Sequence, residues 1–188
     1  MTFSGNPKVG DVEGVHVWRM PSHYDSRGRL IKAYTSADIQ IFPIPFSTYE
    51  HFFTESKASV FRGMHFQGQP HAVSKIISIV QGKAIDLLFD MRKKSQTFGN
   101  LQIIELNESD PESIFIPTGV AHGYLALEDK TILSYRMDGP FCDKCDSGFS
   151  ADMVSMFLPI QLSETIQSQR DVKLPRYENF RFSSQCEQ

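Results

Sequence analysis

The sequence predicts an all-β fold, a sandwich or barrel built from one domain of 188 residues. Many short apolar segments follow one another closely, and no long helical pattern separates them. Turn-forming residues punctuate these segments at Gly68–Pro70, Gln81–Gly82 and Phe98–Asn100. Fifteen phenylalanines among 40% hydrophobic residues supply the large side chains that a single core needs.

Short apolar runs bounded by turn residues define the expected strands. These are Gly14–Met20, Arg29–Tyr34, Ser47–Phe53, Val60–Gln67, Val73–Gln81, Lys83–Phe89, Leu101–Leu106, Ser113–Ile116, Gly123–Leu127 and Thr131–Met137. Helix is expected only in short pieces, around Ser36–Ile41 and near Ser163–Gln169. No repeat or linker divides the chain, so we expect a single domain over 1–188. Its core should span about residues 12–180, and the tail after Phe180 should be loosely ordered.

Composition and charge exclude several classes of function. A formal net charge of -3 gives no basic surface for a nucleic-acid backbone. No apolar run approaches the roughly 18 residues of a membrane span. The segment Met1–Pro7 lacks the charged and apolar regions of a signal peptide. We therefore expect a soluble cytoplasmic protein that binds neither nucleic acid nor membrane.

The two-residue period of strands places a charged group among aliphatic ones. Lys75 shares a strand face with Ile77 and Ile79, and Tyr135 lies on the same face as Leu133. Burying a lysine is costly unless an anion meets it, so Lys75 is a candidate binding or catalytic residue. The structural alternative is an edge lysine that extends its ammonium group to solvent.

Strict alternation would put Arg62 and His65 on opposite faces of their strand. Gly63 lies between them, and glycine within a strand often marks a bulge. We predict an irregularity at Gly63 that brings both side chains to one side.

The spacing Pro117-x-Gly119-x-x-His122 occurs in cupin barrels, where a turn aims the histidine inward. Metal-binding cupins also carry paired histidines and a glutamate. This chain offers His65 and His71, with no glutamate at the expected distance. Because a divalent metal wants three or more ligands in proper geometry, we expect no metal and no cofactor. A metal-dependent cupin isomerase or oxygenase remains an alternative.

Several motifs in order give a more specific resemblance. They are Arg62–Gln67, Lys75, Asp86–Arg92, Ser95–Gly99 and Ile116–Tyr124. In this order and spacing the chain resembles the dTDP-4-dehydrorhamnose 3,5-epimerase family, from about Asp25 to Pro175. The resemblance implies a cupin-like jelly roll with short peripheral helices, usually a homodimer. It also implies metal-free epimerisation of nucleotide-linked 4-keto-6-deoxy sugars.

The resemblance assigns four catalytic roles. His65 would remove the proton next to the ketone, and Asp171 would orient that histidine. Lys75 would stabilise the enolate oxygen, and Tyr135 would return a proton from the opposite face. Independent physical chemistry supports these roles, because a histidine of pKa about 6.5 is a suitable base at neutral pH and a cation stabilises a developing enolate.

Substrate-binding residues also follow from the resemblance. They are Arg27, Arg62, His122, Gln67, Glu50, Lys32 and Phe141. Arg62 and Arg27 match arginines that contact pyrophosphate, Arg27 from the neighbouring protomer through an exchanged N-terminal strand. The chain departs from the family at Lys32, which replaces a glutamate, and at Pro140–Phe141, which replaces an aromatic pair. These departures leave the nucleotide and the sugar open. The number of inverted centres is also open, because it depends on donor placement and on ring flipping between the two steps.

Other readings of the same residues stay open. His65 alone is consistent with a hydrogen-bonded core histidine, and Tyr135 alone with a half-buried strand aromatic. A cupin that binds a nucleotide sugar without turnover is a second function class. Cys142 and Cys145 fit half of a zinc site or a redox pair. Without a further cysteine or histidine pair at zinc-like spacing, we interpret them as plain loop thiols.

Overall fold

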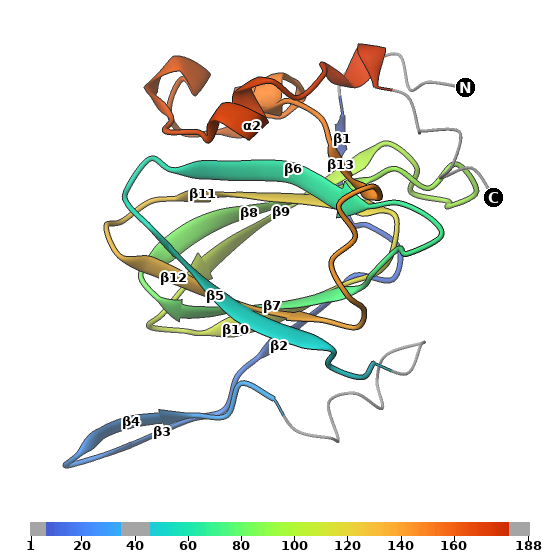
Figure 1. The fold of residues 1–188 in the computed structure, drawn as a ribbon. Coiled ribbons are helices and arrows are strands. Elements are labelled where there is room, and N and C mark those ends of the chain that lie inside the picture. The colour runs from blue at the N-terminus through green and yellow to red at the C-terminus, as the bar shows by residue number, and fades with distance from the viewer. Residues whose placement is uncertain (1–6, 35–45, 181–188) are drawn as a thin grey trace.

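Two β-sheets lie face to face in the computed structural model, which describes residues 7–34 and 46–180 (Figure 1). The six-stranded sheet has the order β1 (Lys8–Val9), β9 (Asn100–Asn107), β8 (Lys83–Asp90), β11 (Val120–Ala126), β6 (Phe61–Gln67) and β13 (Asp146–Gly148). The five-stranded sheet has the order β2 (His16–Arg19), β10 (Glu112–Ile116), β7 (Lys75–Gln81), β12 (Thr131–Met137) and β5 (Glu50–Ser56). This confirms the predicted all-β fold.

A separate hairpin extends away from the two sheets (Figure 1). It consists of β3 (Ser22–Asp25) and β4 (Gly28–Ile31), which pair antiparallel. Its side chains are largely exposed, including Tyr24 at 68% and Leu30 at 55%. These two large apolar side chains share the hairpin with charged ones, including the exposed Arg27–Asp25 pair at its turn.

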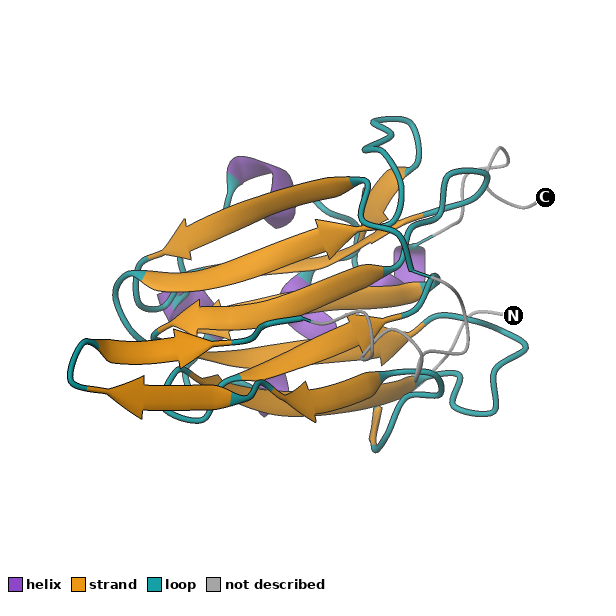
Figure 2. Ribbon diagram, turned by 90° about the horizontal axis from the view of Figure 1, so that it is seen from below, coloured by secondary structure: helices purple, strands orange, loops and turns teal. Residues whose placement is uncertain are grey.

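Short helical segments cover the outer face of the six-stranded sheet, behind the strands in Figure 2. They are η1 (Ala151–Met153), η2 (Ser155–Phe157), η3 (Leu162–Glu164), α2 (Gln169–Val172) and η4 (Tyr177–Asn179). None of the helices in the described ranges reaches the length and hydrophobicity that a membrane crossing requires.

Two apolar cores hold these layers together. Between the sheets, Ile77, Ile79 and Leu133 belong to one buried cluster. A second cluster fills the space between the six-stranded sheet and the C-terminal segments. Its aromatic rings meet edge to face, with Phe149 and Tyr177 centroids 5.1 Å apart. The segment 149–180 is therefore held on the six-stranded sheet by the packing of aromatic side chains.

The predicted irregularity at Gly63 is confirmed. His65 pairs with His122 and Arg62 with Tyr124, so β6 advances three residues while β11 advances two. Gly63 has φ +143°, and a Cβ there would lie 2.4 Å from the Gly123 Cα, so only glycine fits.

Other sequence expectations need correction. The strand expected at Ser47–Phe53 is β5, three residues further on, because β5 pairs with β12 from Glu50 to Ser56. The strand expected at Arg29–Tyr34 is β4, which ends at Ile31. Strands β1, β3 and β13 were not predicted, since they are short and lack a buried, alternating face.

The expected helices had mixed outcomes. Most of Ser163–Gln169 is not helical, and the helical turns lie at its two ends, in η3 and α2. The helix expected around Ser36–Ile41 and the tail after Phe180 lie outside the described residues.

Candidate active site

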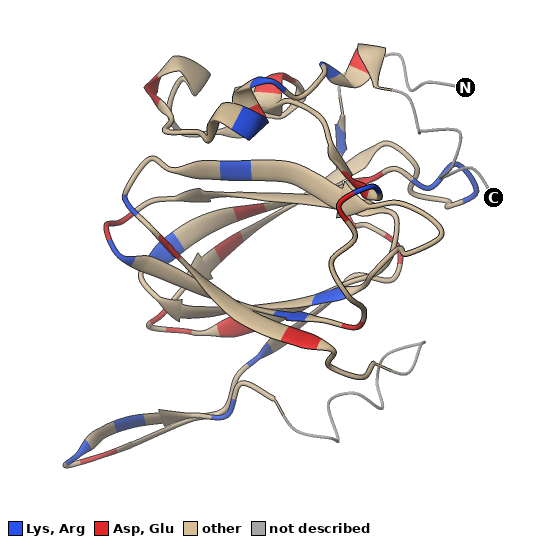
Figure 3. Ribbon diagram, viewed as in Figure 1, with Lys and Arg blue, Asp and Glu red and all other residues tan. Residues whose placement is uncertain are grey.

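A cavity of about 530 Å³ opens between the two sheets at one end of the barrel. Strands from both sheets and the segment 166–171 line it. The lining residues are Phe52, Thr54, Val60, Phe61, Arg62, His65, Lys75, His122, Tyr135, Met137, Ile166, Gln167, Ser168, Arg170 and Asp171. Ionisable groups thus share the cavity wall with aromatic, aliphatic and uncharged polar side chains, and Figure 3 shows acidic and basic residues on the barrel strands themselves.

His65 forms a pair with Asp171 across 106 residues of sequence. The His65 Nε2 and Asp171 Oδ1 atoms are 2.8 Å apart. An ionised carboxylate only accepts hydrogen bonds, so Nε2 carries the proton and Nδ1 keeps the lone pair. This arrangement gives His65 a basic nitrogen with a fixed orientation.

The α2 helix holds the carboxylate in place. The Ser168 side chain caps α2 and accepts a hydrogen bond from the Asp171 backbone N–H at 3.0 Å. Burial pushes the Asp171 pKa upward, but hydrogen bonds and the charge of His65 outweigh it, so the pKa lies below its usual value. Asp171 is therefore a carboxylate at neutral pH.

Lys75 lies beside this pair and is buried, with 8% of its surface exposed. Its Nζ donates to the His65 backbone oxygen at 3.3 Å. Burial lowers the Lys75 pKa to about 8; the charges of Asp146 and Asp86 oppose this shift, and Arg170 adds to it. Lys75 is thus buried on an aliphatic strand face, as the two-residue period predicted, and it lines the same cavity as His65.

Tyr135 lines the same cavity as His65 but lies on the other sheet, since it belongs to β12 and His65 to β6. Its ring stacks on Phe52 with centroids 5.1 Å apart. Burial, and then the neighbouring Tyr124 and Asp86, raise the Tyr135 pKa well above its usual value. The phenol therefore stays protonated and is available as a proton donor.

His122 and Arg62 complete the set of predicted residues that line the cavity. His122 Nε2 lies 2.7 Å from the Asp86 Oδ2, and both side chains are buried. The exposed Arg62 donates from Nε to the Ser56 hydroxyl at 3.1 Å, which orients its guanidinium group.

Five predicted binding residues do not line this cavity in the described chain; they are Arg27, Gln67, Glu50, Lys32 and Phe141. Arg27 sits at the hairpin turn, paired with Asp25 at 2.6 Å. Lys32 is exposed beyond β4. Glu50 accepts a hydrogen bond from the Phe141 backbone N–H at 3.0 Å, outside the cavity. Gln67 is buried, and its amide is bonded to backbone groups of two loops, at His71 in one and at Pro140 and Cys142 in the other.

Sequence reasoning did not assign a role to Arg170 or Thr54. Arg170 is paired with Asp146 at 2.6 Å, and Thr54 lies 2.9 Å from the Tyr124 hydroxyl. The signal for Arg170 is its place beside Asp171, in the short helix that begins after the capping residue Ser168. Thr54 carries no such signal, because the predicted strand ended one residue earlier.

A protein-family model described as dTDP-4-dehydrorhamnose 3,5-epimerase matches residues 10–179. The chain belongs to this family. It is therefore an isomerase of the epimerase type, and its two-sheet barrel is a cupin-like jelly roll.

Individual relatives agree with the family assignment. The dTDP-4-dehydrorhamnose 3,5-epimerase of Mycobacterium tuberculosis H37Rv is 28% identical over 177 residues, 92% of this chain and 88% of the relative. The solved structure of the Sulfolobus tokodaii enzyme has a TM-score of 0.83 and 30% identity, covering 91% of this chain and 94% of that one. The Bacillus anthracis enzyme, solved with TDP and PPi bound, has a TM-score of 0.80 and 27% identity, covering 90% of this chain and 98% of that one.

Proposed function

We propose that this protein epimerises C3, C5 or both in a nucleoside-diphosphate 4-keto-6-deoxy sugar, without a metal in the reaction. One observation carries the proposal. The carboxylate-paired imidazole of His65 and the buried ammonium of Lys75 lie on one cavity, with the Tyr135 phenol on the opposite sheet. The relatives solved with nucleotide bound make thymidine diphosphate the first nucleotide to test.

In the proposed mechanism His65 Nδ1 takes the proton from the ring carbon next to the ketone. The electron pair moves to the carbonyl oxygen, and the Lys75 ammonium stabilises the enolate that forms. Tyr135 then donates its proton to the same carbon from the other face, which inverts the centre. The imidazolium loses its proton and the phenolate regains one by exchange with solvent, so the enzyme returns to its starting state.

Arg62 supports an anionic substrate. Its guanidinium group lines the cavity and is exposed, and arginine binds phosphate oxygens through two parallel hydrogen bonds. The diphosphate would thus lie at the rim, with the sugar between the sheets. Contacts from Glu50, Lys32 and Phe141 to the substrate remain predictions from the sequence, whereas the Gln67 amide is bonded to loop backbone.

Deuterium exchange tests the function. In deuterated water, the wild-type protein should place deuterium at C3 or C5 of a 4-keto nucleotide sugar, as detected by NMR. A Tyr135→Phe variant should still exchange the proton that His65 removes, while inversion falls by about 10²- to 10⁴-fold. A matched control is Tyr49→Phe, at an exposed position that does not line the cavity, which should behave as wild type.

Two outcomes would contradict the function. Tight binding of the nucleotide sugar by folded wild type, with no deuterium uptake from any 4-keto sugar tested, would instead support a binding cupin. Exchange that disappears on metal removal and returns with iron, zinc or manganese would support a metal-dependent cupin.

We also propose a cytoplasmic homodimer in which the β3–β4 hairpin delivers Arg27 to the partner's cavity. The hairpin projects from the barrel, and the Arg27 side chain is 88% exposed (Figure 1). Light scattering should give a mass near twice the 21.4 kDa of one chain. Arg27→Ala should raise KM more than it lowers kcat, because a phosphate contact contributes to binding. A monomer in active protein would refute this assembly.

A further inference from the structure

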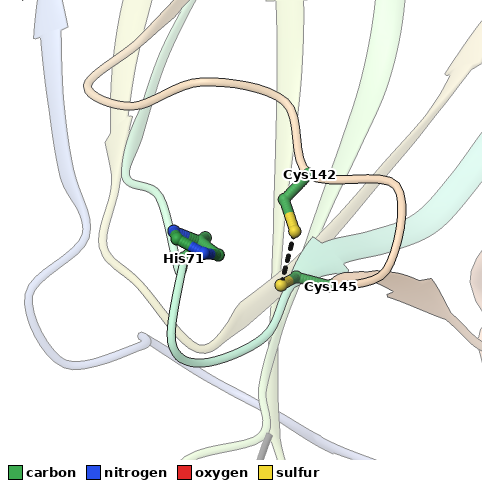
Figure 4. A group of neighbouring side chains, drawn as sticks. All are labelled: His71, Cys142 and Cys145. Carbon is green, nitrogen blue, oxygen red and sulfur yellow. Dashed lines mark hydrogen bonds between the residues drawn. The ribbon is translucent and has the colours of Figure 1, made fainter. Parts of the chain in front are cut away.

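Three metal-ligating side chains meet outside the cavity, on two loops that are distant in sequence. His71 comes from the loop 68–74 after β6, and Cys142 and Cys145 come from the loop 138–145 before β13 (Figure 4). The ligand atoms of these three residues all lie within 4.8 Å of one another, and the two sulfurs are 2.6 Å apart. None of the three lines the cavity of His65.

Buried Gln67 holds the two loops in position. Its Nε2 donates to the backbone oxygens of His71 and Pro140, the latter at 3.0 Å. Its Oε1 accepts from the Cys142 backbone N–H at 2.9 Å. One amide side chain thus bonds to both ligand-bearing loops, and the Gly68 N–H adds a bond to the Cys145 oxygen at 2.8 Å. The ligands are organised by a network of the kind that supports metal sites.

Local backbone geometry brings the cysteines together. The Cys145 and Asp146 N–H groups both donate to the Cys142 backbone oxygen, at 2.9 and 2.8 Å. This turn points both sulfurs to the same side, as Figure 4 shows. A Cys-x-x-Cys turn supplies half of many zinc sites, and a histidine from another loop is the missing third ligand.

We propose that Cys142, Cys145 and His71 bind a zinc ion. Thiolate and imidazole are the ligands that zinc prefers, and three protein ligands leave a fourth tetrahedral position for water. Zinc–sulfur bonds of about 2.3 Å would hold the sulfurs about 3.8 Å apart, so binding requires them to separate by about 1 Å. A small side-chain rotation of the half-buried Cys142 provides that movement.

Burial defines how an ion would reach the site. Cys145 is buried, Cys142 is half-buried and His71 is exposed. The exposed imidazole lies on the solvent side, so the ion enters past His71, which then closes the site. The metal would join the loop that leads into Lys75 to the loop that follows β12. It would act as a structural clamp, separate from the proposed proton transfers.

Metal titration of the full-length protein tests the site. Protein purified under reducing conditions and stripped of metal should bind one Zn²⁺ per chain, measured by elemental analysis. Co²⁺ should give the visible absorption of tetrahedral thiolate coordination. Zinc at 100 times its Kd should raise Tm by about 5 to 10 °C, because it binds only the folded chain.

Variants assign the ligands. Cys142→Ser combined with Cys145→Ser should abolish the Co²⁺ absorption, and His71→Ala should weaken binding at least about tenfold. Gln67→Ala should weaken it about 10- to 100-fold by releasing the loops. Cys186→Ser, the third cysteine, and His23→Ala, on the exposed hairpin, are matched controls and should bind as wild type.

Two results would overturn the proposal. The first is that folded, reduced wild-type protein fails to bind one zinc ion per chain, which elemental analysis measures without any variant. The other is a Cys142–Cys145 disulfide that persists in protein kept under reducing conditions, because a disulfide removes both thiolate ligands. Neither result bears on epimerase activity, which the deuterium experiment measures separately.

Discussion

A His65→Asn variant is expected to lose about 10²- to 10⁴-fold in kcat, the contribution of a general base. Asparagine keeps a polar group near Asp171 but has no basic nitrogen to receive a carbon-bound proton. Both deuterium uptake and inversion should fall together, because proton removal precedes both. Rates are measured by NMR with saturating nucleotide sugar.

The matched control is His51→Asn. His51 lies on β5 outside the cavity and contacts Ser134 at 2.9 Å, so its loss should leave kcat within about twofold. Nucleotide binding by His65→Asn should stay close to wild type, which separates a chemical defect from a folding defect. A folded His65→Asn protein with wild-type exchange would exclude His65 as the base.

A Lys75→Met variant should lower kcat by about 10²- to 10³-fold, the usual cost of removing one group that stabilises an oxyanion. The same change should make the protein more stable. Burial lowers the Lys75 pKa from 10.5 to about 8, which corresponds to about 3 kcal/mol of unfavourable free energy for the charged form. Replacing it with an apolar side chain of similar length should raise Tm by roughly 5 to 10 °C. Loss of activity with gain of stability is expected for a residue retained for chemistry.

The pH dependence provides a second measurement on Lys75. The proposed role needs the ammonium form, so kcat/KM should fall as pH rises through about 8. The folded pKa lies below the unfolded value, so the unfolded chain binds more protons between about pH 8 and 10.5, and Lys75 makes stability rise with pH across that window. In Lys75→Arg the alkaline fall in kcat/KM should disappear, because arginine stays charged.

Lys83→Met serves as the matched control for both measurements. Lys83 is half-exposed and pairs with Glu128 at 3.2 Å, away from the cavity. The Lys83→Met variant should have the wild-type kcat and the wild-type fall in kcat/KM at alkaline pH. Suppose that Lys75→Met, like Lys83→Met, kept the wild-type kcat and the fall in kcat/KM near pH 8. Lys75 would then not be the group that stabilises the enolate.

Sequence patterns predicted those parts of the site that lie on regular strands. The period of two placed Lys75 and Tyr135 on inward faces, and both are buried there. Gly63 signalled the bulge that brings Arg62 and His65 to one cavity. These predictions succeeded because side-chain direction in a strand follows from local backbone geometry.

Loop geometry could not be predicted in the same way. Gln67 belongs to the motif that contains His65, yet its amide bonds to loop backbone rather than facing the cavity. The approach of His71 to Cys142 depends on hydrogen bonds between segments about 70 residues apart. No local pattern encodes such contacts. The proposed contact of Arg27 with the partner's cavity depends on how two chains associate, and a pattern within one chain does not encode that.

The distance along the chain between His65 and Asp171 has a consequence during protein synthesis. Every barrel strand, β13 included, ends by Gly148, whereas the carboxylate arrives later, on a segment fixed by Phe149 and Tyr177. A ribosome adds about 5–20 residues per second. The barrel strands can therefore be complete seconds before Asp171 is available to orient His65. Translation products that stop before residue 171 would lack the paired imidazole. Catalytic competence therefore requires that synthesis has passed residue 171.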